Sequence, residues 1–302
     1  MPVAQNSTGS VAPLGEFAQI LLNAAITGSI YLLAGTGLTL TYGLLRFPNF
    51  AYAEFITFGG YIGYLLLQKP DGSLPLAVAA AFFATGLLSL FSHLLCFRPL
   101  VNRRASLIPL MVASIGLGYI IRYSIGEMWS WAALSYQPVW QAFDLGPVRV
   151  TALWLYLIGA ALFTGIGLHL LLTRTKTGKA IRAIAGNPDL ALVSGINRDR
   201  ITFFTCFLGA GFAGVAGVFR AADTQLSPVL GWDILLPIFA VVILGGIGSF
   251  YGLIMAAFLL GLAENFGVIL LQAVGLSTEY RMAIAFLVLI LVLIFRPKGL
   301  AG

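Results

Sequence analysis

The sequence predicts an all-α polytopic membrane protein, and three observations carry that prediction. Of its 302 residues, 59% are hydrophobic and only 9% are charged, whereas a soluble domain usually has about 25% charged residues. The mean hydropathy is +0.96. Apolar runs of about 20 residues recur with short connections, and a run of that length spans the roughly 30 Å hydrocarbon core as a helix. Because no separate soluble domain fits, residues 1–302 are expected to form one transmembrane domain.

Nine apolar stretches are expected to form the membrane spans, with eight as the alternative. The stretch 234–248 is short, and a re-entrant helix there would lower the number by one. An odd number of crossings places the two termini on opposite sides of the membrane. The expected spans are 17–45, 50–68, 74–97, 107–125, 150–172, 201–221, 234–248, 251–272 and 279–295.

The distribution of Lys and Arg predicts the orientation. Cytoplasmic loops carry an excess of basic residues, so the three basic groups of this chain are assigned to the cytoplasm together with the C-terminus. The polar tail 1–16 is then extracytoplasmic. Because the charge of +6 follows topology instead of forming one patch, nucleic acid is not an expected partner. The cytoplasmic groups are Arg98 with Arg103 and Arg104, six residues from Arg174 to Arg200, and Arg296 with Lys298; the basic residues expected in outer loops are Lys69, Arg122, Arg149, Arg220 and Arg281.

Two interruptions of the apolar pattern suggest a substrate path. Pro48 breaks the helical pattern within residues 43–60, and four glycines fall within residues 244–252. Non-helical backbone at membrane depth persists only where it is buried in protein or lines a wet cavity. Two such breaks are also expected of a fold with two related halves, although no residue-by-residue repeat is found. The candidate path residues are Thr39, Tyr42, Asn49, Tyr52, Glu54, Gly245, Gly246, Gly248, Ser249 and Glu264.

Two of these candidates, Glu54 and Glu264, are the acidic residues placed most deeply within apolar spans. Ionisable residues at such positions are costly and normally face the bundle interior or water, so each is a functional candidate. For Glu54 the alternative is a carboxylate at a helix start after Pro48, favoured by the helix dipole. For Glu264 the alternative is an interhelical hydrogen bond near the membrane boundary.

The sequence offers little support for catalysis or for a metal site. His93 and His169 have no metal-ligand spacing to other His, Cys or acidic residues. The chain has no phosphate-binding loop of the G-x-x-x-x-G-K-[ST] type, and no Ser, His and Asp share a plausible membrane depth. Cys96 and Cys206 lie in apolar runs and are expected to be small buried hydrophobes. We therefore expect no catalytic residue, metal or cofactor in this chain.

The segment 173–200 is the one stretch with soluble character inside the apolar chain. It predicts a short basic helix that ends at Asn187-Pro188, and its charge suggests a cytoplasmic docking surface. A general anchor for anionic lipid is the alternative.

Motifs along nearly the whole chain resemble those of the permease subunits of bacterial ABC importers for branched-chain or hydrophobic amino acids and, in sister systems, amides or urea. Residues 37–43 and 49–61 match the family's G-L-x-L-x-Y-G and N-x-A-H-G-x-x-x-x-x-G-A-Y. Residues 178–197 match its cytoplasmic loop, G-x-A-x-R-A-x-x-x-N followed by A and G-I-N. Residues 244–252 match L-G-G-x-G-[ST]-x-x-G, and residues 296–300 match R-P-x-G-L. The departures are Tyr52, Ala53 and Gly60 in place of the usual His, Gly and Ala.

The resemblance implies a permease fold of the type II ABC importers, with 173–200 as the coupling loop that meets an ATPase. It implies as partners a second homologous permease, two cytoplasmic ATPase subunits that use ATP and Mg, and a solute-binding protein at the outer loops 126–149 and 223–233. The location implied is the bacterial inner membrane. The residues implied to couple to the ATPase are Gly178, Lys179, Arg182, Ala183, Asn187, Gly195, Ile196 and Asn197.

Two other classes remain open from the sequence. An ion-gradient-driven secondary transporter or channel would use Glu54 as its proton or cation site. A membrane-embedded enzyme would need a nucleophile or an acid/base pair that the sequence does not offer. The sequence also leaves the solute open among branched-chain, neutral and other amino acids, amides and urea.

Overall fold

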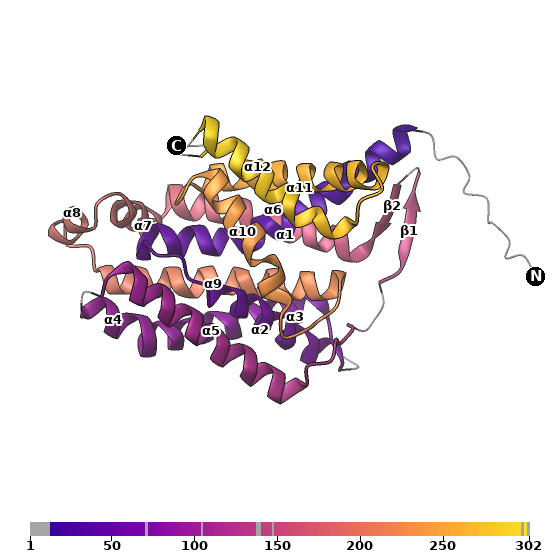
Figure 1. The fold of residues 1–302 in the computed structure, drawn as a ribbon. Helices are drawn as coiled ribbons and strands as arrows, with labels where there is room; N and C mark the ends of the chain where they lie inside the picture. The colour runs from indigo at the N-terminus through magenta and orange to yellow at the C-terminus, as the bar shows by residue number, and fades with distance from the viewer. Residues whose placement is uncertain are drawn as a thin grey trace, which may run out of the picture.

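The computed structural model describes residues 13–69, 72–103, 105–136, 140–146, 148–296 and 299–300. A helix occupies each of the nine expected spans (Figure 1), which confirms the all-α polytopic class. Arg104, Lys298 and residues 1–12 of the expected tail lie outside the described residues. The helices are α1 (Pro13–Leu45), α2 (Tyr52–Leu67), α3 (Leu74–Ser92), α5 (Leu107–Trp129), α6 (Ala152–Arg174), α9 (Arg198–Asp223), α10 (Leu230–Gly245), α11 (Phe250–Ala273) and α12 (Arg281–Phe295).

Within the described residues, six helices are long and apolar enough to cross a membrane. One of them combines α3 with a π-helical turn, η1 (His93–Phe97), and α4 (Arg98–Asn102), so the expected span 74–97 runs on to Asn102. The helices α10 and α12 are apolar but shorter. At 1.5 Å per residue, the 16 residues of α10 measure about 24 Å, which is less than the hydrocarbon core.

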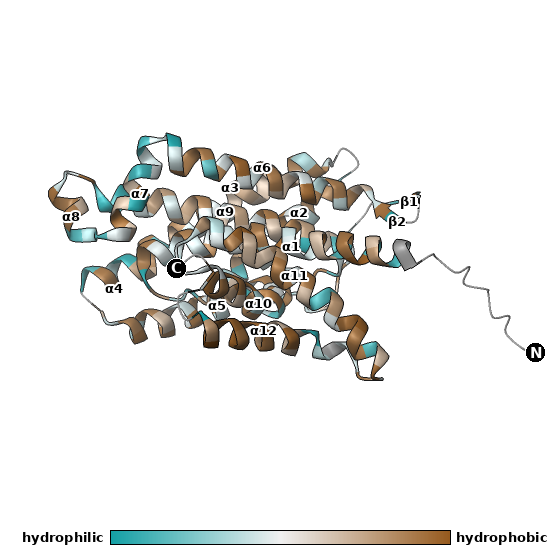
Figure 2. Cartoon of the chain, turned by 90° about the horizontal axis from the view of Figure 1, so that it is seen from above, coloured by the Kyte–Doolittle hydropathy of each residue, from teal (hydrophilic) through white to brown (hydrophobic). Residues whose placement is uncertain are grey.

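Polar elements gather at the two ends of the helix bundle. The short helices α7 (Lys176–Gly186) and α8 (Pro188–Val193) lie beside α4 at one end, which we call the basic end (Figure 1). The strands β1 (Ala142–Leu145) and β2 (Val148–Thr151) form an antiparallel hairpin at the opposite end, the hairpin end. Figure 2 shows hydrophilic residues on α7 and in the chain around α8, and hydrophobic residues along the long helices.

The hairpin end is more ordered than the sequence indicated. The expected outer segment 126–149 contains β1 and the first residues of β2. It also forms a backbone pairing with the connection between α9 and α10. Leu134 and Leu226 exchange two backbone hydrogen bonds of 2.8 Å. The Leu226 side chain is fully buried, and the Tyr136 hydroxyl donates a hydrogen bond to the Gly60 carbonyl. The α9–α10 connection therefore folds back between the helices.

Helix α9 lies at the centre of the bundle, packed against α1, α2 and α3. Its Gly and Ala residues allow close contact: a Cβ on Gly37 of α1 would collide with the backbone of Gly209, and one on Gly59 of α2 with the backbone of Gly214. Tyr52 is fully buried at this junction, and its hydroxyl lies 2.6 Å from the Ala34 carbonyl oxygen, to which it donates a hydrogen bond. The candidate path residue Tyr52 thus fastens α2 to α1.

Candidate functional site

The helix α7 at the basic end is amphipathic and is fixed to the ends of α1 and α6. The Thr175 hydroxyl caps it by accepting a hydrogen bond from the Gly178 backbone N–H at 3.0 Å. Gly178 touches the backbone of α6, where a Cβ would meet the Leu171 carbonyl. Ile181 and Ile184 are buried in a small cluster with Leu44 and Ala191. This packing leaves the opposite face of α7 exposed.

Three of the predicted coupling residues shape the backbone of this region. The Asn187 side chain caps α8, accepting from the N–H groups of Asp189 and Leu190 at 3.1 Å each. Asn197 caps α9 in the same way, accepting from the Arg200 N–H at 3.1 Å. Gly195 has φ +80°, a conformation in which a side chain is strained. These residues hold the turn between helices, and Ile196 packs against the cluster under α7.

The surface of α7 and α8 combines basic and apolar side chains. Lys179, Arg182 and Ala183 are exposed on α7. On α8, Leu190 is 63% exposed and Val193 is 86% exposed. Apolar side chains exposed outside the spanning helices are typical of a contact with another protein.

The first interruption joins α1 to α2 through residues 46–51. The Asn49 side chain accepts a hydrogen bond from the Ala51 N–H at 3.1 Å and so fixes the turn, while the Phe50 N–H donates to the Ser114 hydroxyl of α5. The Arg46 guanidinium donates to the Ala185 carbonyl at 3.1 Å, at the end of α7. Tyr42 is half-buried one turn before the break. Its carbonyl accepts a hydrogen bond from the Arg46 backbone N–H.

The second interruption, residues 246–249, lies against the last turn of α1. Gly246 and Gly248 have φ of +93° and +80°, and the Ser249 hydroxyl caps α11 by accepting from the Gly252 N–H at 3.2 Å. Gly245 touches the backbone of Gly252. A Cβ built on Gly43 of α1 would lie 3.5 Å from the Cα of Gly248, so this connection packs beside the end of the helix that precedes the first interruption.

A pocket of about 230 Å³ opens beside the two interruptions at the basic end. It brings the path candidates Thr39, Gly248 and Ser249 together with the coupling candidate Arg182. His169 also lines it, with its Nδ1 hydrogen-bonded to the Tyr251 hydroxyl at 2.7 Å. The coupling residues and the path residues were predicted in separate segments of the sequence. The structure brings members of both sets to one pocket.

Glu54 lies at the start of α2 in a buried ion pair with Arg122 of α5. The Arg122 Nε lies 3.0 Å from Glu54 Oε1, and its Nη2 donates to the same oxygen. The guanidinium is also 4.8 Å from the Trp232 ring centroid and 5.4 Å from that of Tyr119. The expectation that Arg122 occupies an outer loop was therefore wrong: its charge is neutralised inside the bundle by an acid 68 residues away in sequence.

Glu264 of α11 is buried in a second network that joins α1, α11 and α12. The Tyr31 hydroxyl donates to its carboxylate, with oxygen separations of 2.8 and 2.9 Å, and the Arg281 Nε donates at 2.8 Å. Arg281 also donates to the Thr27 hydroxyl at 3.1 Å. Arg281 was expected in an outer loop, but it begins α12 and points at a buried acid. The interhelical hydrogen bond considered for Glu264 is present as part of this larger network.

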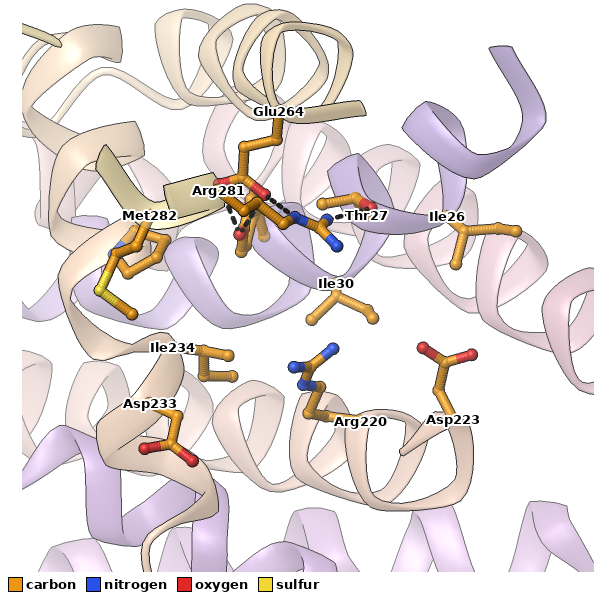
Figure 3. Close-up of a pocket in the computed structure, with 12 residues that line it drawn as sticks. Ile26, Thr27, Ile30, Arg220, Asp223, Asp233, Ile234, Glu264, Arg281 and Met282 are labelled. Carbon is orange, nitrogen blue, oxygen red and sulfur yellow. Dashed lines mark hydrogen bonds and ion pairs between the residues drawn. The ribbon is translucent and has the colours of Figure 1, made fainter. Parts of the chain in front are cut away.

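The second network lines a pocket of about 210 Å³ at the hairpin end (Figure 3). Its wall includes Arg220 and Asp223 near the end of α9 and Asp233 in the first turn of α10. Sequence reasoning assigned Arg220 to an outer loop and missed Asp223 and Asp233 as pocket residues. The available signal was an Arg with acidic residues at helix ends, but the pairing of distant helices cannot be derived from one sequence.

The candidate path residues therefore divide between the two ends. Thr39, Gly248 and Ser249 lie at the basic-end pocket, Glu264 lies at the hairpin-end pocket, and Glu54 lies in an internal ion pair. Within the described residues, no group of three or more His, Cys, Asp or Glu side chains could hold a metal ion.

A bundle of apolar helices, six of them within the described residues long enough to cross a membrane, with a pocket near each end, is the architecture of a polytopic membrane protein. The family described as "Branched-chain amino acid transport system / permease component" matches residues 20–293. The chain is 31% identical over 302 residues to the high-affinity branched-chain amino acid transport system permease protein BraD of Pseudomonas aeruginosa, covering 95% of this chain and 96% of BraD. It is 31% identical to the branched-chain amino acid transport permease protein LivH of Methanocaldococcus jannaschii, covering 96% and 93%.

The chain belongs to this family of transport-system permease components, as the motifs indicated. It is a multi-pass membrane protein of a transport system and is not a member of a catalytic family. A shorter similarity, 32% identity over 137 residues and 42% of this chain, extends to the ribose import permease protein RbsC of Escherichia coli.

Proposed function

We propose that this chain forms half of the translocation path of an ATP-driven importer for branched-chain amino acids. The observation that carries the proposal is the α7–α8 unit, a rigid and exposed basic surface that adjoins a pocket at the interrupted helices. In this proposal the basic end faces the cytoplasm, the N-terminus is outside, the C-terminus is inside, and the membrane is the bacterial inner membrane. Residues 1–302 act as one transmembrane domain.

The α7–α8 unit is the contact to the ATPase. Asn187 and Asn197 cap the helices α8 and α9, and Gly178 packs closely on α6. These residues fix the shape of the unit and do not themselves touch the ATPase. The contact itself is made by exposed side chains, namely Arg182, Leu190 and Val193. Because Arg182 also lines the basic-end pocket, movement of α7 reaches the path directly.

The remaining partners follow from the same assignment. A second, similar permease completes the path, two ATPase subunits bind and hydrolyse ATP with Mg, and this chain holds no cofactor of its own. A solute-binding protein delivers the solute at the hairpin end, where the segments 126–149 and 223–233 are joined through Leu134 and Leu226. Inward and outward opening then alternate as ATP is bound and hydrolysed.

The test replaces Arg182 with Glu in the complete transporter, reconstituted in proteoliposomes. We expect loss of ATPase co-purification and of ATP-dependent leucine uptake, because a reversed charge at a docking surface repels its partner. Lys69→Glu, at an exposed Lys that follows α2, is the matched control and should leave the complex and its uptake intact. Uptake by this chain alone without ATP would overturn the proposal and favour an ion-driven transporter.

A further inference from the structure

The hairpin-end pocket contains both acidic and basic side chains. Two of them, Glu264 and Arg281, already form an ion pair with each other. Glu264 receives hydrogen bonds from Tyr31 and Arg281, and Arg281 also reaches Thr27. This network closes one side of the pocket, as Figure 3 shows by its dashed lines. Glu264 and Arg281 neutralise each other, so the charge available to a ligand comes from the opposite wall.

That opposite wall presents one basic group, Arg220, and two acidic groups, Asp223 of α9 and Asp233 of α10. In Figure 3 the Asp233 carboxylate lies apart from the space that Arg220 and Asp223 share. The Arg220 guanidinium makes no hydrogen bond or ion pair with any described residue, although the residue is half-buried. Asp223 lies one turn further along α9, and one of its oxygens accepts a hydrogen bond from Trp154 Nε1 at 2.9 Å. The two charges form no ion pair with each other within the described residues, and Figure 3 shows both directed into the same space below Ile30.

Leaving a charge partly desolvated without a partner is unfavourable. A ligand that supplies a carboxylate to Arg220 and an ammonium to Asp223 would satisfy both groups. A guanidinium binds a carboxylate through two parallel hydrogen bonds, which gives this pairing its selectivity. Urea and uncharged amides offer neither charge.

Apart from Asp233, the remaining residues of the pocket wall are apolar. They are side chains of α1, α10 and α12, namely Ile26, Ile30, Ile234, Pro237 and Met282. Binding sites of this kind use a few convergent polar groups for orientation and apolar side chains for most of the contact. An aliphatic side chain therefore fits beside the charged wall.

We propose that this pocket binds the zwitterion of an aliphatic α-amino acid, with its carboxylate on Arg220, its ammonium on Asp223 and its side chain against Ile26, Ile30 and Ile234. The inference rests on the proposed function and gives the solute a site within this chain. The site lies at the end opposite α7 and α8 (Figure 1), where a solute delivered from outside would enter.

The experiment uses isothermal titration calorimetry to measure binding of three ligands to the assembled permease and ATPase subunits in lipid nanodiscs, with the solute-binding protein left out. L-leucine carries both charges, L-leucinamide lacks the carboxylate, and 4-methylpentanoate lacks the ammonium. We expect leucine to bind about 10- to 100-fold more tightly than either analogue, which is the range for losing one hydrogen-bonded charge. Equal affinity for all three ligands, or no saturable leucine binding, would overturn the site.

Two variants test the assignment of the charges. Arg220→Gln should weaken leucine binding by about 10- to 100-fold and leave leucinamide binding unchanged. Asp223→Asn keeps an acceptor for Trp154 and should weaken leucine binding while leaving 4-methylpentanoate binding unchanged. The matched controls are Lys69→Gln and Glu16→Gln, exposed residues outside the pocket and outside segments 126–149 and 223–233, which should bind like the wild type. Size-exclusion profiles and ATPase recovery confirm that each variant assembles.

The results separate this inference from the proposed function. If Arg220→Gln binds leucine normally while uptake still requires ATP, the pocket assignment fails and the importer stands. If uptake never requires ATP, the importer proposal fails whatever the pocket binds. Equal weakening of leucine and leucinamide by Arg220→Gln also overturns the carboxylate assignment.

Discussion

Removing the Arg122 guanidinium should cost the chain more stability than removing any exposed basic group. Arg122 reaches Glu54 through Nε at 3.0 Å and through Nη2, and both side chains are buried at the junction of α2, α5 and α10. Arg122→Gln leaves the Glu54 carboxylate without its countercharge. We therefore expect this variant to unfold more easily than the wild type.

The magnitude follows from burial. The Glu54 side chain is 1% exposed and that of Arg122 is 10% exposed. Breaking a buried pair by removing one partner costs about 3–5 kcal/mol, because a buried charge remains uncompensated. The Arg98–Asp199 pair has side chains 43% and 58% exposed, and such surface pairs contribute about 0–1 kcal/mol. Arg98→Gln is therefore the matched control.

The Glu264–Arg281 pair should rank between these two. Glu264 is 2% exposed but Arg281 is 40% exposed, and the Tyr31 hydroxyl continues to donate to the carboxylate after Arg281 is replaced. In the double variant Glu54→Gln, Arg122→Gln, no buried charge is left, so most of the lost stability should return. This recovery distinguishes a charge effect from general damage to packing.

The assay is reversible SDS unfolding of the purified chain in mixed micelles, followed by tryptophan fluorescence. The free energy of unfolding should fall most for Arg122→Gln, less for Arg281→Gln and least for Arg98→Gln. The reasoning is refuted if Arg122→Gln costs no more than Arg98→Gln, or if the double variant is as unstable as the single one.

Three further predictions concern backbone geometry. Asn187→Ala should destabilise α8 by about 1 kcal/mol and speed its amide hydrogen exchange about fivefold, whereas Asn187→Asp should retain the cap. Gly59→Ala should lower thermal stability by about 1–3 kcal/mol through collision with Gly214, whereas Gly116→Ala, which meets nothing within 4 Å, should not. Gly195→Ala should cost about 1–2 kcal/mol at its positive φ, measured as faster exchange in the turn after α8; an unchanged rate contradicts the strain.

The sequence was sufficient to predict the helices because their determinants are local. Apolar runs and breaks at Pro48 and at Gly245–Ser249 lie within a few residues of the structures they specify. The β-hairpin at residues 142–151 was not predicted, since residues 126–149 were expected only to form an outer loop. The continuation of α3 through a π-helical turn was also missed, because no sequence break marks it.

The sequence identified residues of the candidate site only where the residue type was unusual for its surroundings. Glu54 and Glu264 stood out as acids in apolar spans, and each has a buried network. Their partners Arg122 and Arg281 were wrongly assigned to outer loops because they belong to none of the three basic groups that the orientation rule places in the cytoplasm. The true partners are 68 and 17 residues away, and only helix packing brings them together.

The geometry also separates two roles within the family motif of residues 178–197. Gly178, Asn187, Gly195 and Asn197 are explained by close packing, helix caps and a positive φ, so the motif mainly specifies the shape of the α7–α8 unit. The side chains free to contact a partner lie between these positions.

The same unit is tied to the basic-end pocket and the helices around it by three kinds of contact. Arg46 bonds to the Ala185 carbonyl at the end of α7, Ile181 packs on Leu44, and Arg182 lines the pocket beside Gly248. Since Gly248 also packs beside Gly43 at the end of α1, a displacement of α7 must change either these contacts or the shape of the pocket. Under the proposed coupling, the α7–α8 unit needs no separate transmitting element, because its buried face already forms part of the structure around the two helix connections.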